Sequence, residues 1–167
     1  MKLVYFPHPS LLTNSNPVTE FNSDLELITK QMIELMHQSS GIGLAANQVA
    51  LNKRIFVMQC DNTKPAYVFI NPEIISNDNE LEKNTEGCLS FPGLSLEISR
   101  QKEITLKWQD IKGNVLTENF NGLEAVCIQH ETDHLNGINF IEKLGNVKKM
   151  MALKKYASSK NKIKKLT

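Results

Sequence analysis

The sequence lacks a long apolar run, and this absence argues against an integral membrane protein. Its 167 residues contain no stretch of 18 consecutive apolar residues, so no membrane-spanning helix is predicted. The apolar piece at residues 3–6 is short and ends at Pro7, unlike the long apolar region of a secretory signal peptide. We therefore expect a cytoplasmic protein that does not bind a membrane.

The sequence is also poor in cysteine and has no typical phosphate-binding loop. Its three cysteines, Cys60, Cys88 and Cys127, are odd in number and have no paired spacing, so a disulfide framework is not expected. Each alone is most simply a small buried residue. The glycine-rich residues 41–48 lack G-x-G-x-x-G and a following lysine, which argues against a loop that cradles phosphate.

The net charge is small, but the charged residues are unevenly distributed along the chain. The formal net charge is +1, yet nine lysines and no acidic residue lie between Lys143 and the last residue. Residues 1–142 then carry ten basic against eighteen acidic side chains, a net charge of −8. An acidic body with a basic tail at about residues 143–167 favours a polyanionic partner. A solvated helix face explains the same lysines equally well.

The apolar periodicity predicts three helices. The first starts at Ser23, where Glu26 three residues later completes a capping box. The second starts at Asn121, which can cap it, and stops at Gly137. The last spans about residues 146–160. The first helix carries a buried apolar stripe made of Leu25, Ile28, Met32, Leu35 and Met36.

Short apolar or alternating runs predict β-strands between these helices. A strand, a polar turn at residues 76–79 and a return strand are predicted within residues 74–87, and residues 110–114 form a hairpin turn. The pair Asn71-Pro72 ends the strand before it. The remaining predicted strands are residues 54–58, 67–70, 94–99, 104–108 and 115–120.

Together these elements predict an α+β fold. Small antiparallel or mixed β-sheets pack around a central helix, with an N-terminal and a C-terminal helix beside them. Hydrophobic residues make up 41% and charged residues 22%, as in folded globular proteins. The length fits one domain and no repeat or linker interrupts it, so residues 1–167 are predicted to form a single catalytic domain.

The second predicted helix carries the pattern H-E-x-x-H. His130 and His134 lie one turn apart on the same face, where both imidazoles can bind one metal ion. Glu131 stands beside that ion, placed to exchange protons with a bound water. A lone histidine on an apolar face is usually a core residue, but this pair with a glutamate between favours a metal site.

A catalytic zinc-type site needs a third protein ligand. Cys88 is the favoured candidate because it follows Gly87 in a tight loop, although spacing alone leaves Cys60 and Cys127 open. Glu142 is the one downstream residue near the distance at which metalloproteases have their third ligand, but it comes after Gly137, where the helix is expected to end. His8 and His37 have no partner at ligand spacing and are expected to be structural or exposed.

Three segments resemble, in order and spacing, the signature motifs of the peptide deformylases. They are residues 41–48 (GIGLAANQ), residues 86–90 (EGCLS) and residues 130–137 (HETDHLNG). The resemblance runs through essentially the whole chain and is to the bacterial type 1 with a C-terminal helix. Thr132 is the one departure, since the family usually has an apolar residue there, and it is not a chemical position.

The resemblance implies a metal-dependent hydrolase that removes the formyl group from the N-terminal formyl-methionine of new proteins and releases formate. It implies one Fe(2+) ion per chain, replaceable by Zn, Ni or Co, held by Cys88, His130 and His134. A metal-bound hydroxide attacks the formyl carbon while Glu131 acts as general base and then acid. The Gln48 side-chain amide and the Leu89 backbone N–H stabilise the oxyanion.

The resemblance also implies a substrate site. The substrate backbone pairs as an added strand near Ile42, Gly43 and Gly87, although both glycines could simply form turns. Leu123, Val126 and Cys127 line a methionine pocket, unless they are ordinary core. Without the resemblance, Gln48 would more simply be a polar residue at a strand end.

The implied partners are N-formylmethionyl peptides, nascent chains and the ribosome near its exit tunnel, reached through the basic C-terminal helix. A monomer is expected. Two other interpretations compete: a zinc endopeptidase, and a metal-stabilised binding module without activity. Glu86 is further expected to pair with Arg100 as a structural acid.

Overall fold

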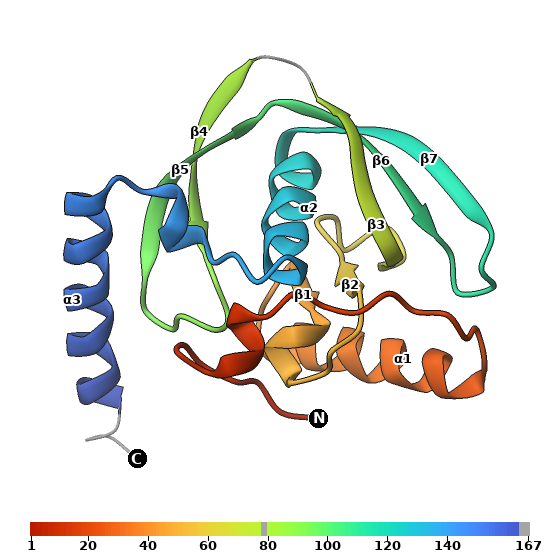
Figure 1. Ribbon diagram of the computed structural model, residues 1–167, viewed down its shortest axis with the longest axis horizontal. Coiled ribbons are helices and arrows are strands. Elements are labelled where there is room, and N and C mark those ends of the chain that lie inside the picture. Colours follow the sequence, from red (N-terminus) through yellow and green to blue (C-terminus); the bar gives the residue numbers. More distant parts are fainter. Residues whose placement is uncertain (78–79, 164–167) are drawn as a thin grey trace.

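The computed structural model describes residues 1–77 and 80–163, and the side chains of residues 1–76 and 80–159. Lys164 and Lys165 of the predicted basic tail therefore lie outside the described residues. Within the described part, three α-helices accompany two antiparallel sheets (Figure 1), which confirms the predicted α+β fold. The helices are α1 (Ser23–Gln38), α2 (Gly122–Leu135) and α3 (Asn146–Ile163).

The larger sheet has five strands in the order β1-β2-β3-β6-β7, and the smaller one pairs β4 with β5. Short 3₁₀ helices at Pro9–Leu12, Ala46–Val49 and Phe140–Lys143 connect these elements. The strands are β1 (Gly43–Ala45), β2 (Ile55–Met58), β3 (Tyr67–Asn77), β4 (Leu81–Gly87), β5 (Ser95–Gln101), β6 (Glu103–Gln109) and β7 (Val115–Asn121).

The strand prediction was wrong in two places around β3. Asn71-Pro72 does not end the strand, because β3 continues to Asn77 after a register shift between Ile70 and Glu73. Asn71 has a φ of 51° and its amide bonds Val18, so it interrupts the ladder locally without breaking the strand. The expected return strand, β4, pairs with β5 instead of β3.

The start of α1 also differs from the prediction. Asn22, not Ser23, caps the helix, and its side chain accepts a hydrogen bond from Leu25 N at 3.1 Å. Ser23 is already the first helical residue, so the predicted capping box of Ser23 and Glu26 was wrong, and Leu25, three residues after Asn22, has no side-chain acceptor to complete one. The expected apolar stripe is present. Met32 and Met36 are fully buried in a core cluster that also contains Ile55 and Val57 of β2.

Helix α2 lies at the centre of the molecule, with strands arching over it (Figure 1). Ten of its residues are buried, so it is enclosed on nearly all sides rather than on one face. An aromatic cluster beneath it includes Phe56, Phe69 and Phe120, and Ile128 of α2 packs into the same core. Truncating such a buried ring typically costs about 3–5 kcal/mol, so the core holds the helix firmly.

Asn121 occupies the N-cap of α2 without a side-chain capping bond, and Gly137 follows its end with a φ of 70°. Among the described residues, no helix is both long and apolar enough to cross a membrane.

Candidate active site

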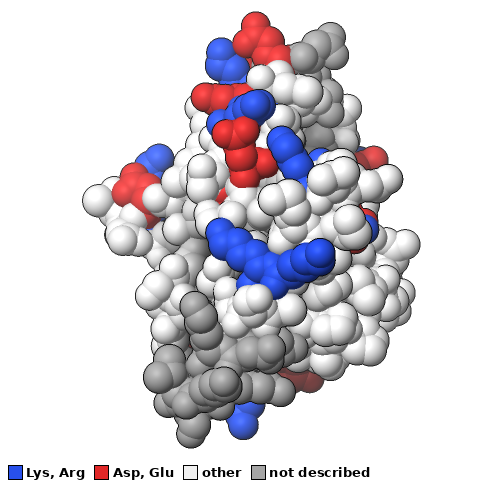
Figure 2. Space-filling view, turned by 90° about the vertical axis from the view of Figure 1, so that its left-hand side faces the viewer, with Lys and Arg blue, Asp and Glu red and all other residues white. Residues whose placement is uncertain are grey.

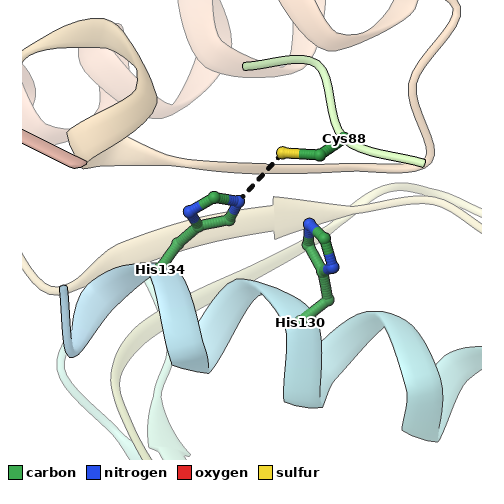
Figure 3. A group of neighbouring side chains, drawn as sticks. All are labelled: Cys88, His130 and His134. Atoms are coloured by element: carbon green, nitrogen blue, oxygen red, sulfur yellow. Dashed lines mark hydrogen bonds between the residues drawn. The ribbon is translucent and has the colours of Figure 1, made fainter. Parts of the chain in front are cut away.

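Three side chains from two distant segments converge above α2 (Figure 3). His130 and His134 are one helical turn apart with ring centroids separated by 4.9 Å, and Cys88 follows directly after β4. One ligand atom from each of the three lies within 4.8 Å of the others. In the part of the chain that the structure describes, this is the one such group of His, Cys, Asp or Glu.

The chemistry of these atoms fits a divalent metal ion. His130 Nδ1 hydrogen-bonds Glu86 Oε2 at 2.8 Å, which leaves Nε2 free to bind a metal ion. His134 Nε2 lies 3.1 Å from Cys88 Sγ. Burial lowers the pKa of His134 well below its ordinary value, so the ring is neutral as a ligand must be. One thiolate and two imidazoles are a donor set that suits Zn(II) or Fe(II).

A network of charged side chains holds His130 in place. Arg100 donates to both carboxylate oxygens of Glu86, at 2.7 and 3.0 Å, and also pairs with Asp133. Lys143 extends this network to the surface, with its Nζ 3.0 Å from Asp133 Oδ1. Burial opposes ionisation of Glu86, but hydrogen bonds from His130 and Arg100 outweigh it and lower its pKa to about 2. The expected Glu86–Arg100 pair is therefore present, and Asp133 was missed although it lies inside the H-E-x-x-H motif.

Glu131 is 4% exposed and lies beside the cluster. Its burial is the main reason why its pKa rises to about 7, so it can hold or release a proton near neutral pH. A side chain at Gly43 would meet Glu131 Oε1 at 2.5 Å and Cys127 Sγ at 2.7 Å. Gly43 is thus a glycine because β1 passes close to α2, not because it forms a turn.

Gln48 is 1% exposed, and its side chain is oriented by a backbone bond. Its Oε1 accepts from Ala45 N at 2.8 Å, so its Nε2 points the other way, toward Cys88 Sγ at 3.6 Å. The same amide donates to Ser90 Oγ at 3.2 Å. The 3₁₀ helix Ala46–Val49, which the sequence did not predict, places this amide donor beside Cys88.

A cavity of about 650 Å³ opens over these groups. Ile42 and Leu123 are 42% and 55% exposed at its rim, while Val126 and Cys127 are buried in its wall. His134 alone of the predicted site residues does not line it, and it is 1% exposed. The predicted residues that do line it are Ile42, Gly43, Gln48, Gly87, Cys88, Leu89, Leu123, Val126, Cys127, His130 and Glu131.

Part of the cavity wall escaped the sequence analysis. Phe91, Pro92 and Leu94 also line the cavity, from the loop between β4 and β5. The run Phe91-Pro92-Gly93 directly after the cysteine motif was the available signal, since an apolar residue in a tight loop beside a candidate ligand suggests a pocket wall.

Two strand ends face this cavity. Among the strands that the structure describes, β1 is an edge strand that pairs with β2 alone, and β4 pairs with β5 alone. Gly43 in β1 and Gly87 at the end of β4 both line the cavity. An extended peptide could therefore add to either strand by main-chain hydrogen bonds.

A helix that presents H-E-x-x-H next to a cysteine thiolate, with a buried carboxylate and amide at the same cavity, is a site of the metallohydrolase class. The sequence pattern of the family described as polypeptide deformylase matches residues 1–150. The chain therefore belongs to the polypeptide deformylase family, a family of metal-dependent enzymes, as the three sequence motifs predicted.

Individual relatives support this assignment over nearly the whole chain. Peptide deformylase from Thermotoga petrophila is 43% identical over 150 residues, covering 90% of each chain. That from Erythrobacter litoralis is 40% identical, covering 92% of this chain and 94% of the relative. A solved peptide deformylase from Legionella pneumophila has a TM-score of 0.90 at 35% identity, covering 96% and 95% of the two chains. The enzyme from Synechococcus elongatus in complex with actinonin has a TM-score of 0.89 at 36% identity, covering 93% and 87%.

Proposed function

We propose that this chain removes the formyl group from the N-terminal formyl-methionine of new proteins by hydrolysis and releases formate. Family membership supports the reaction, and the cluster of Cys88, His130 and His134 supports its metal dependence. We further propose one Fe(2+) ion per chain at this cluster, with Zn, Ni or Co able to replace it. When bound, such an ion would polarise the formyl carbonyl and make a water molecule acidic.

The chain's own groups move the proton. Glu131 takes it from the attacking water and returns it to the amine that leaves. Its position supports this role, because the carboxylate is buried next to the ligand histidines and has a pKa of about 7. Positioned proton transfer of this kind typically contributes about 10²–10⁴ in rate.

Gln48 and Leu89 bind the negative oxygen that forms at the formyl carbon. The Ala45 N–H holds the Gln48 side chain so that its amide N–H groups face the ligand cysteine. The Leu89 backbone follows Cys88 directly and lines the same cavity. The Gln48 donor is held in place before the substrate arrives, which is what makes such groups effective.

The substrate binds as an added strand. Its backbone lies between the free edge of β1 near Ile42 and the end of β4 at Gly87. The methionine side chain enters the apolar part of the cavity formed by Leu123, Val126 and Cys127. Cys127 and Val126 also pack into the molecule, so the pocket wall and the core are partly the same residues.

The observation that carries the proposal is the meeting of Glu131 and Gln48 at one Cys/His/His cluster, since a purely structural metal site needs neither group. The test is to incubate anaerobically purified, metal-analysed protein with a formyl-Met-Ala-type peptide and with an internal peptide substrate. We expect formate release from the first and no cleavage of the second. Internal cleavage would identify an endopeptidase instead, and metal binding without either product would identify a binding module.

We also propose that the protein acts in the cytoplasm as a monomer and docks on the ribosome through α3. Figure 2 shows a band of basic side chains across the middle of the face on which α3 lies, with acidic and basic side chains mixed above it. Lys148, Lys154 and Lys155 are exposed on this helix and suit ribosomal RNA phosphates. An affinity for ribosomes that is insensitive to salt, or unchanged after truncation at residue 143, would contradict this docking.

A further inference from the structure

The loop that carries Cys88 and Leu89 packs against the last helix. Helix α3 stands at the side of the molecule next to β4 and β5 (Figure 1), and it shares one core cluster with the loop between these strands. Tyr156 of α3 is 4% exposed. Its ring packs against Phe91 of the loop at a centroid distance of 5.1 Å, and against Phe6 of the N-terminal arm at 6.3 Å.

The hydroxyl group of Tyr156 lies beside two backbone carbonyl groups. It donates to the carbonyl oxygen of Phe6 at 3.2 Å and, more weakly, to that of Ser90 at 3.5 Å. The carbonyl oxygen of Ser90 also accepts from the backbone N–H of Phe6 at 3.1 Å. Tyr156, the N-terminal arm and the loop after β4 are therefore joined by hydrogen bonds at Ser90.

Ser90 and the N-terminal arm also bind Gln48. The Val4 N–H, two residues before Phe6, donates to the carbonyl oxygen of Gln48 at 2.8 Å. The Gln48 side-chain amide in turn donates to Ser90 Oγ at 3.2 Å, and Ser90 is fully buried. An amide nitrogen carries two hydrogens, so a bond from one of them to Ser90 fixes the direction of the other. The position of Ser90 therefore decides where the second N–H of Gln48 points.

We propose that Tyr156 is a positioning residue for the Gln48 amide, because its hydroxyl holds the backbone at Ser90 and Ser90 orients the amide. The kinetic part of this inference rests on the proposed deformylase activity. Tyr156 lies outside the substrate cavity that the described residues form, so it acts through Ser90 and not by touching the substrate. If Tyr156 served only to pack α3, its ring would be sufficient and its hydroxyl would not affect turnover.

The first test removes the hydroxyl alone. Tyr156→Phe keeps the ring contacts with Phe91 and Phe6. We expect kcat for a formyl-methionyl peptide, per metal-loaded protein, to fall about fivefold, the factor that corresponds to one ordinary hydrogen bond. KM should change less than about twofold, as expected when an interaction matters in the transition state. Tyr67→Phe is the matched control and should keep the unmodified kcat, since Tyr67 is also partly buried but packs in a different core cluster.

A double-mutant cycle separates the positioning of Gln48 from a general effect on the fold. In a Gln48→Ala background, Tyr156→Phe should change kcat less than about twofold, because the amide that it positions is gone. An equal loss of kcat in both backgrounds would overturn the proposal. An unchanged kcat in Tyr156→Phe alone would overturn it as well.

A spectroscopic test is independent of activity. In zinc-loaded protein, the side-chain amide resonances of Gln48 are assigned by NMR from their loss in Gln48→Ala. We expect them to shift in Tyr156→Phe and to stay in place in Tyr67→Phe. Unshifted resonances in Tyr156→Phe would contradict the positioning role, whether or not the protein releases formate. Shifted resonances in a protein that releases no formate would support that role and count against the proposed function alone.

Discussion

Helices α2 and α3 both carry many polar side chains, but they place them in opposite surroundings. On α2, Gln129, His130, Glu131 and His134 are all buried. On the described part of α3, only Ala152 and Tyr156 are buried, and Val147, Met150 and Met151 are 59–69% exposed together with the lysines. Buried polar groups with fixed partners can act on a substrate bound in the cavity. Exposed charges on the surface can act only on a separate macromolecule that docks there.

The comparison predicts the largest effect at Glu131. Glu131→Gln removes the proton carrier but none of the ligands, so kcat should fall by about 10²–10⁴ while metal content stays unchanged. Turnover of a formyl peptide and metal analysis of the same sample check this. Retained turnover would show that another group carries the proton.

The second largest loss of activity is expected at Gln48, because its side chain faces the same site from outside α2. Gln48→Glu keeps the acceptor for Ala45 N–H but loses the amide donor, and we expect kcat to fall by about 10²–10³. Gln48→Ala should fall by a similar factor. If Gln48→Glu were fully active, the amide would have only a structural role.

A substitution at Glu86 tests whether the charged network beside α2 orients His130. Glu86→Gln should weaken metal affinity by about 10–100-fold, because His130 loses the carboxylate that orients it. Glu97→Gln is the matched control, since its partner pair with Lys83 joins the same two strands but both side chains are over 60% exposed. A similar loss of metal affinity in both variants would contradict the specific role of Glu86.

The same group predicts a pH dependence. Because folding lowers the pKa of Glu86 to about 2, its ion pairs stabilise the protein above its unfolded pKa of about 4.5. This stabilisation is lost as the pH falls from about 4.5 toward 2. Acid unfolding of Glu86→Gln should therefore depend less steeply on pH in that window than unfolding of the unmodified chain.

The smallest effects on chemistry are expected at the exposed lysines of α3. Replacing Lys148, Lys154 and Lys155 by alanine should change kcat/KM for a short formyl peptide less than about twofold, since effects of exposed charges are small. Ribosome affinity should fall, and the slope of its salt dependence should decrease by about one for each phosphate group that a lysine no longer binds. Alanine at the exposed Lys30 and Lys53 provides the control. Loss of peptide turnover in the α3 variant alone would show that these lysines shape the site.

The sequence by itself determined the helices, most strands and the position of the metal-binding motif, because these depend on local periodicity and spacing. The sequence also indicated the family, because each of the three motifs is a short contiguous segment. The position of β4 and the continuation of β3 past Asn71 were not local properties, since strand partners come from distant segments.

Only the tertiary structure decided which cysteine lies beside the two histidines. Spacing left Cys60, Cys88 and Cys127 open, whereas the fold brings Cys88 to His134. The same is true of Gly43, whose lack of a side chain is explained by Glu131 on a different element. Proximity between segments far apart in sequence arises when sheets and helices bury their apolar surfaces together, and no local pattern encodes it.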